Sequence, residues 1–206
     1  MPKYSKTEEQ INVYSHLIGA ILSVIALVLL LIKAIPTKNL AKIFSFAFFG
    51  LSLIELYTMS TIYHATKDEA LRIKTQKGDH LSINILIAGS NAAFLFGGLQ
   101  NKLGYILGGV VMALSLLSIV LNCINVRKFR DISMVIYIVT GWMCIFIINS
   151  LKQIIGIGWV PLLVGGLAYT FGLIFYGIKK PYMHAIWHFF VLAGSICHFV
   201  AVFFYV

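Results

Sequence analysis

Long apolar runs separated by short polar segments dominate this chain. Seven of these runs have close to the roughly 20 residues that an α-helix needs to cross a bilayer. The polar breaks between them contain Pro, Gly, Asn or groups of Lys and Arg, which end helices or occur in turns. The pattern predicts an all-α fold, a polytopic membrane bundle of seven transmembrane helices that forms one domain over residues 1–206. The expected spans lie at about 15–35, 43–64, 80–100, 103–123, 132–151, 159–178 and 184–205.

Composition agrees with lipid as the solvent of this fold. Hydrophobic residues make up 60% of the chain and charged residues 11%, whereas a soluble domain carries roughly a quarter charged residues. The formal net charge of +9 could indicate nucleic-acid binding. However, the basic residues form short clusters between apolar runs rather than a continuous stripe, so we expect loop anchors and no nucleic-acid partner. Glu8 and Glu9 precede the first run and no small-residue cleavage site follows it, so we expect no removable signal peptide.

Lysine and arginine are distributed unevenly between the two sides of the predicted bundle. Eleven of them fall on the side of the N-terminus and five on the opposite side. Cytoplasmic loops of membrane proteins carry the excess of these residues. The bias predicts a cytoplasmic N-terminus and, with seven spans, an outside C-terminus. Lys33, Lys38 and Lys42, in the first outer loop, weaken the bias without reversing it.

Several polar side chains lie within or at the ends of spans, where each needs a partner or a function. Ser60 and His64 end the second span, Asp79 opens the third, and His184 and His188 open the seventh. Residues four apart lie about 40° from each other around a helix, so each pair shares one face. The end of span two and the starts of spans three and seven lie on the same side of the membrane. These five side chains can therefore meet at one depth.

Three histidines with a fourth position left open are the usual ligands of catalytic zinc. We therefore predict that His64, His184 and His188 bind Zn²⁺, which brings the pKa of a bound water to about 7. Asp79 could orient that water or take its proton, and Ser60 could hydrogen-bond the water or a substrate carbonyl. A lone histidine near a membrane surface is more often a residue at headgroup level. The i,i+4 pair and the matching depth favour the metal site here.

The other ionisable residues near spans have less definite roles. His16 and His80 fall at the same cytoplasmic level, and either could replace one of the three ligands or hydrogen-bond to one. His198 lies fourteen residues beyond His184, about 21 Å along a helix, which is too far to share the metal. Glu55 lies in mid-span on the opposite side of the helix from His64. We expect Glu55 to be protonated or paired with a polar group of a neighbouring span.

These residues resemble the hemolysin III family, a bacterial branch of the seven-span superfamily that includes adiponectin and progestin receptors and alkaline ceramidases. The resemblance covers nearly the whole chain and implies a multi-pass protein of a bacterial cell membrane with a cytoplasmic N-terminus. It also implies zinc on His64, His184 and His188, with Ser60 and Asp79 near the metal-bound water. Where the family usually reads Leu-Asp-His, this chain has Gly in place of Leu and keeps the acidic group. Four motifs carry the resemblance: the segment 9–16 with Ser15-His16-Leu17-Ile18-Gly19, the run 60–64, Gly78-Asp79-His80, and the run 184–188 leading to His198.

The leading functional hypothesis is a membrane-embedded zinc hydrolase that acts on a lipid amide or ester and contributes to membrane lipid homeostasis. The ceramidase-like relatives support this class by analogy. The expected partners are membrane lipids and a lipid-like substrate. Two alternatives stay open: a sensor or receptor in which zinc only ties spans two and seven together, and a pore-forming hemolysin. No span shows the sustained polar stripe that would line a channel.

Overall fold

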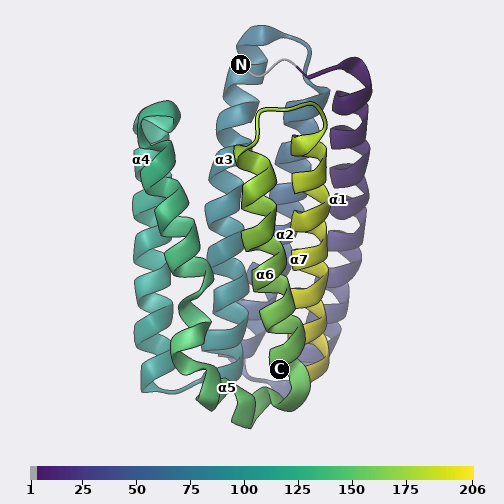
Figure 1. The fold of residues 1–206 in the computed structure, drawn as a ribbon. Helices are drawn as coiled ribbons and strands as arrows, with labels where there is room; N and C mark the ends of the chain where they lie inside the picture. Colours follow the sequence, from purple (N-terminus) through teal and green to yellow (C-terminus); the bar gives the residue numbers. More distant parts are fainter. Residues whose placement is uncertain (1–3) are drawn as a thin grey trace.

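A computed structural model describes residues 4–206, and every regular element within this range is helical. The long helices run roughly antiparallel to their sequence neighbours and form an elongated bundle (Figure 1). Shorter 3-10 and π-helical segments connect or extend them. In chain order the elements are α1 (Lys6–Ala34), η1 (Ile35–Thr37), α2 (Leu40–Ala65), α3 (Glu69–Ala92), η2 (Ala93–Leu99), α4 (Lys102–Gly141), η3 (Met143–Ile147), α5 (Ile148–Ile155), η4 (Gly156–Gly158), α6 (Trp159–Gly177) and α7 (Met183–Tyr205).

The distribution of side chains identifies lipid as the surrounding medium. Six helical stretches are long and apolar enough to cross a membrane. Large apolar side chains such as Ile18, Ile25 and Ile32 of α1 are more than half exposed on the outside of the bundle. Polar side chains such as Asn12 and Ser82 are fully buried inside it. An apolar exterior around a partly polar interior is the arrangement expected in a bilayer, and the chain is a multi-span membrane protein.

Helix α4 is two helical arms joined at Asn125, which has φ −160° and ψ 98°. The chain reverses direction there, so the two arms lie antiparallel (Figure 1). Hydrogen bonds tie the arms together: Asn122 Nδ2 donates to Tyr137 Oη over 3.3 Å, and Ser133 Oγ donates to Asn122 Oδ1 over 3.1 Å. The side chain of Asn125 accepts from the backbone N–H of Lys128 and caps the second arm. The turn expected at the basic run 127–131 therefore begins at Asn125, and most of that run is helical.

Helix α3 begins well before the apolar run that predicts it. The polar stretch 67–77 was expected to be a connection, but α3 starts at Glu69. Asp68 is the cause, because its carboxylate accepts a hydrogen bond from the backbone N–H of Leu71 over 2.7 Å. About three helical turns (69–78) thus precede Asp79. They carry Arg72 to the same end of the bundle as the start of α1.

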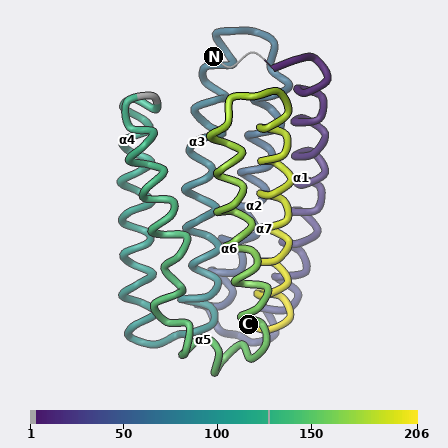
Figure 2. The backbone as a smooth tube through the Cα atoms, in the orientation of Figure 1, coloured from purple at the N-terminus to yellow at the C-terminus, as the bar shows by residue number. Residues whose placement is uncertain are grey.

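Close packing brings α1, α2 and α7 together. A Cβ added at Gly19 of α1 would lie 2.5 Å from the ring of Tyr57 in α2, so the missing side chain allows that ring to fit. Tyr57 Oη in turn donates to Ser195 Oγ of α7 over 2.7 Å. One end of the bundle holds the start of α1, the end of α2 and the starts of α3 and α7 (Figure 2). Helix α7 ends at the opposite end of the bundle.

Candidate metal centre

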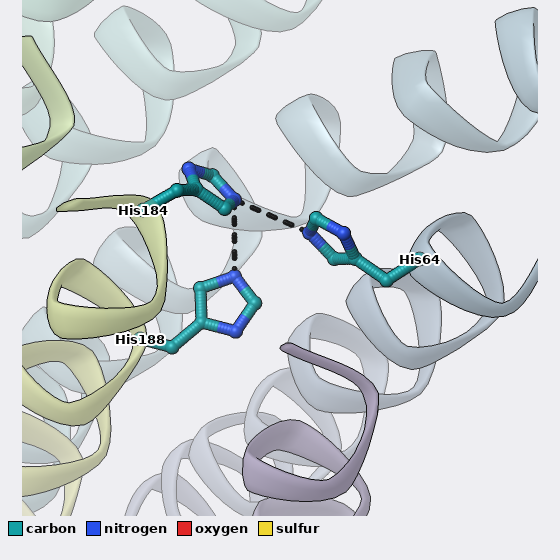
Figure 3. A group of neighbouring side chains, drawn as sticks. All are labelled: His64, His184 and His188. Carbon is teal, nitrogen blue, oxygen red and sulfur yellow. Dashed lines mark hydrogen bonds between the residues drawn. The ribbon is translucent and has the colours of Figure 1, made fainter. Parts of the chain in front are cut away.

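The three histidines predicted as ligands lie together at that shared end, between α2 and α7 (Figure 3). His184 Nε2 lies 3.2 Å from His64 Nε2 and 3.1 Å from His188 Nε2. His64 and His188 are almost fully buried. Each ring offers one nitrogen, and these three nitrogens all lie within 4.8 Å of one another. The group could therefore hold a metal ion.

Two of the three distances between the nitrogens suit a small tetrahedral cation. Zinc binds imidazole nitrogen at about 2.0–2.1 Å, so two nitrogens on one tetrahedral ion lie about 3.3 Å apart. The two Nε2–Nε2 distances around His184 are close to this value. The one-turn separation of His184 and His188 places both rings on the same face of α7.

Hydrogen bonds on the far side of two rings assign their protons. His64 Nδ1 lies 2.7 Å from Glu9 Oε2, and a carboxylate can only accept, so His64 Nδ1 carries the proton. Ser15 Oγ donates to the carbonyl oxygen of Asn12, which leaves it to accept from His188 Nδ1 over 3.2 Å. In both neutral rings Nε2 then bears a lone pair. These lone pairs point into the cluster, an arrangement that a cation stabilises.

A second layer of contacts holds Glu9 in place. Arg72, from the first turns of α3, forms an ion pair with the carboxylate of Glu9. The chain Arg72–Glu9–His64 therefore links three helices and fixes the orientation of one imidazole. A carboxylate that orients a metal-binding histidine in this way also raises the basicity of the ligand.

An aromatic ring covers the cluster on its outer side. Tyr4 precedes α1, and its ring is stacked against His184 with centroids 5.1 Å apart. Burial, with smaller contributions from Tyr63 and Tyr176, raises the pKa of the Tyr4 phenol well above its usual range. The phenol therefore stays neutral at physiological pH. Together with the buried histidine rings, it separates the cluster from bulk water.

Asp79 and Ser60 lie next to the cluster without belonging to it. Ser60 is buried one turn before His64 on α2. The carboxyl of Asp79, on α3, faces Ser60 and lies near His64 and His80. The ligand group consists of the three histidines, and Asp79 is not part of it. Asp79 and Ser60 are therefore neighbours of the cluster, and their part in any chemistry stays a prediction.

The structure separates the remaining histidines. His16 stacks on His188 with ring centroids 3.6 Å apart, yet it is not a member of the ligand group. His80 lies beside Asp79 and lines an internal cavity. His198 packs against Tyr169 nearer the other end of α7, as the helical distance predicted. Neither His16 nor His80 replaces one of the three ligands in this arrangement.

The sequence pattern did not predict that Glu9 and Ser15 of α1 contact the histidine ligands. Both contact ligand nitrogens that face away from the cluster. A signal was available, because Asn12, Ser15 and His16 are polar residues spaced by three and four at the start of an apolar helix. That spacing places them on one face, and a polar face on a membrane helix turns toward the protein interior.

Comparison with known proteins agrees with this arrangement. The family described as Haemolysin-III related matches residues 4–199. The chain belongs to the haemolysin III family. Among members of this family, it is 40% identical over 200 residues to the Hemolysin-3 homolog of Bacillus subtilis, covering 96% of this chain and 94% of that protein. It is 38% identical to Hemolysin-3 of Bacillus cereus over 201 residues, 97% of this chain and 92% of that protein.

A more distant similarity extends beyond bacteria. The ADIPOR-like receptor IZH2 of Saccharomyces cerevisiae is 28% identical over 224 residues, which cover 92% of this chain and 69% of the yeast protein. No solved structure matches the chain.

The contact between Glu9 and His64 leads to a prediction about metal affinity. Replacing Glu9 with Gln is expected to weaken metal binding about 10–100-fold, because a neutral amide orients and polarises the His64 ring less well than a carboxylate. The measurement is a competition titration of purified protein against a chromophoric chelator. Glu69→Gln is the matched control, since Glu69 is an exposed carboxylate near the same end of the bundle. Equal affinities for the Glu9 and Glu69 variants would contradict an orienting role.

Proposed function

We propose that this haemolysin III protein is a membrane zinc hydrolase that cleaves an amide or ester bond of a lipid. The observation that carries the proposal is the buried convergence of three imidazole Nε2 atoms beside a carboxyl and a hydroxyl group. Three histidines are the ligand set that leaves a coordination position free for chemistry. A site that only cross-links helices is more often closed by a fourth protein ligand.

Each residue of the site has a separate role in such a reaction. Zn²⁺, when bound, would activate water and polarise a carbonyl group. His64, His184 and His188 would hold the ion. Asp79 accepts the proton released from the attacking water and later delivers it to the leaving group. Ser60 donates a hydrogen bond to the substrate carbonyl oxygen, where negative charge develops.

An internal cavity next to the cluster supports a lipid-like substrate. Most of its lining consists of apolar side chains from five helices, such as Leu56, Leu86, Ile138, Leu173 and Val191. The cavity approaches the histidines through Tyr176, which also lines it and whose ring lies 6.1 Å from that of His184. A mostly apolar lining with a few placed polar groups is the usual form of a small-molecule binding site. The acyl chain of a substrate would lie among these side chains.

Polar side chains on the same cavity suit the other part of an amphiphile. His80 and Arg130 both line it. His80 follows Asp79 in α3 and so lies near the histidine cluster, and Arg130 lies at the start of the second arm of α4. A headgroup would bind there, which brings the bond between headgroup and acyl chain close to Asp79.

We also propose that the protein crosses the membrane seven times with its N-terminus in the cytoplasm. The start of α1 and the end of α7 lie at opposite ends of the bundle, which requires an odd number of crossings (Figure 1). The stretch Lys128–Gly177 supplies two of them, because its two long helical parts run in opposite directions. The excess of Lys and Arg at the histidine end favours the cytoplasm for that end.

Two lysines at the opposite end have a structural role that accounts for their position. Lys33 donates to the backbone carbonyl of Phe203, and Lys42 donates to that of Val206 over 2.6 Å. Cations beside the last carbonyls of a helix satisfy unpaired acceptors and the helix dipole. These lysines therefore serve the C-terminus of α7, and their presence outside is compatible with the proposed orientation.

The activity is tested with purified protein loaded with Zn²⁺ in lipid nanodiscs. Wild-type protein is expected to release fatty acid from at least one member of a panel of ceramides, acyl amides and lysolipids, measured by mass spectrometry. His188→Ala is expected to reduce release to background, because it removes one of three ligands. As a control, wild-type protein stripped by a chelator should lose activity and regain it on addition of Zn²⁺. Absence of turnover across the panel by metal-loaded protein would count against catalysis and favour a structural metal.

A further inference from the structure

Glu55 faces outward from the middle of a membrane helix. It lies in α2, fifteen residues after the helix starts at Leu40 and ten before it ends at Ala65. The sequence led us to expect a protonated side chain or a polar partner on a neighbouring span. The side chain is exposed on the surface of the bundle, so no neighbouring span of the described chain supplies that partner. Within residues 4–206, Glu55 has no hydrogen bond and no ion pair.

The surface around Glu55 is otherwise apolar. On the same face of α2, Leu51 lies one turn before it and Ile62 two turns after it, and they are 54% and 43% exposed. The contact between Gly19 and Tyr57 places residues near Ile21 of α1 at the depth of Glu55, and Ile21 is also exposed. Thr58, partly exposed one turn away, is the other polar residue on this face of α2. A monomer would thus present one carboxyl group directly to hydrocarbon.

A cation to neutralise Glu55 is not available at this depth in the described part of the chain. The basic residues lie toward the ends of the predicted spans, and Lys33 and Lys42 are occupied with the C-terminus of α7. An ionisable side chain exposed to the bilayer centre is costly and is normally covered by protein. The group that covers Glu55 must therefore be a hydrogen-bonding partner supplied by another molecule.

We propose that the outer face of α2 centred on Glu55 is the interface of a homodimer. At a two-fold axis the same residue of both copies meets itself. A neutral carboxyl group both donates and accepts hydrogen bonds, so it is complementary to a second copy of itself. The pair Glu55–Glu55 satisfies both side chains without any cation, and the hydroxyl of Thr58 lies one turn away to extend the network. Interhelical hydrogen bonds between polar side chains drive association of helices in membranes.

The dimer interface and the histidine cluster occupy opposite faces of α2. Glu55 and His64 are nine residues apart, which corresponds to about 180° around the helix axis. A change at Glu55 should therefore alter association without altering metal binding. This separation supplies an internal control for the fold of each variant.

The test compares three proteins by native mass spectrometry after release from nanodiscs, and by subunit counting in vesicles at several lipid-to-protein ratios. Wild-type protein is expected to be dimeric. Glu55→Leu should weaken association by about tenfold or more, because it removes the paired hydrogen bonds. Glu55→Gln should remain dimeric, since an amide is also both donor and acceptor. Metal content should be the same in all three proteins.

Three results would overturn the proposal. One is a wild-type protein that stays monomeric at every lipid-to-protein ratio. Another is a Glu55→Leu variant that dimerises as strongly as the wild type. The third is a Glu55→Gln variant that dissociates as readily as Glu55→Leu while retaining its metal, which would show that hydrogen bonding between the two side chains does not hold the copies together.

Discussion

Protein carrying His184→Ala is expected to lose its bound metal almost completely. His184 is the central member of the cluster, with its Nε2 atom 3.1–3.2 Å from those of both other histidines. Structural zinc sites with four ligands bind with about 10–16 kcal/mol, so one ligand accounts for about 3 kcal/mol, or more than about a hundredfold in Kd. Elemental analysis of purified protein should find about one metal ion per chain in the wild type and a trace in the variant.

The matched control for this experiment is His198→Ala. It is the same substitution in the same helix, but His198 packs against Phe94 and Tyr169 far from the cluster. Its metal content should equal that of the wild type. The same analysis identifies the metal, because histidine sites accept several divalent ions. Wild-type protein purified without chelators that contains no stoichiometric metal, or a His184 variant that retains it, would contradict the metal site.

Much of the helical arrangement could be predicted because membrane helices follow a simple rule. Every backbone polar group must be satisfied within the bilayer, so a sufficiently long apolar run is helical. The rule describes only the part of a helix that lies in lipid. Helix α3 extends about three turns further, because Asp68 caps it in a polar stretch where hydropathy gives no signal. The break expected at the basic run 127–131 likewise lies a little earlier, at Asn125, whose side chain caps the next arm and keeps most of the basic run helical.

The candidate site was predictable to the extent that its geometry follows from helix spacing and connectivity. His184 and His188 share a helix face because they are four residues apart. The order of the spans places His64 at the same end of the bundle. The contacts of Glu9 and Ser15 with the ligand rings depend on how α1 packs against α2 and α7. Spacing along one helix holds no information about that packing. The stacking of His16 on His188 has the same origin, which is why its role stayed undecided in the sequence.

Replacing Asp79 with Asn is expected to abolish most catalysis while leaving the metal in place. The two side chains have nearly the same shape, so Asn can keep the contact with Ser60. An amide cannot take up the proton that hydrolysis releases. A positioned general acid or base contributes about 10²–10⁴-fold, so kcat should fall by that factor with little change in KM. The measurement is steady-state release of fatty acid from the best substrate of the panel.

The comparison of Asp79→Asn with His188→Ala separates chemistry from metal binding. Asp79 lies outside the ligand group, so the Asn variant should contain as much metal as the wild type and show the same thermal stability. The histidine variant should lose metal and activity together. Ser60→Ala should fall between them, with kcat lowered by about 10²-fold if its hydroxyl stabilises developing charge on the carbonyl oxygen. An Asp79→Asn protein with full metal and undiminished turnover would exclude this carboxyl group as the proton acceptor, because no protonation step could then depend on it.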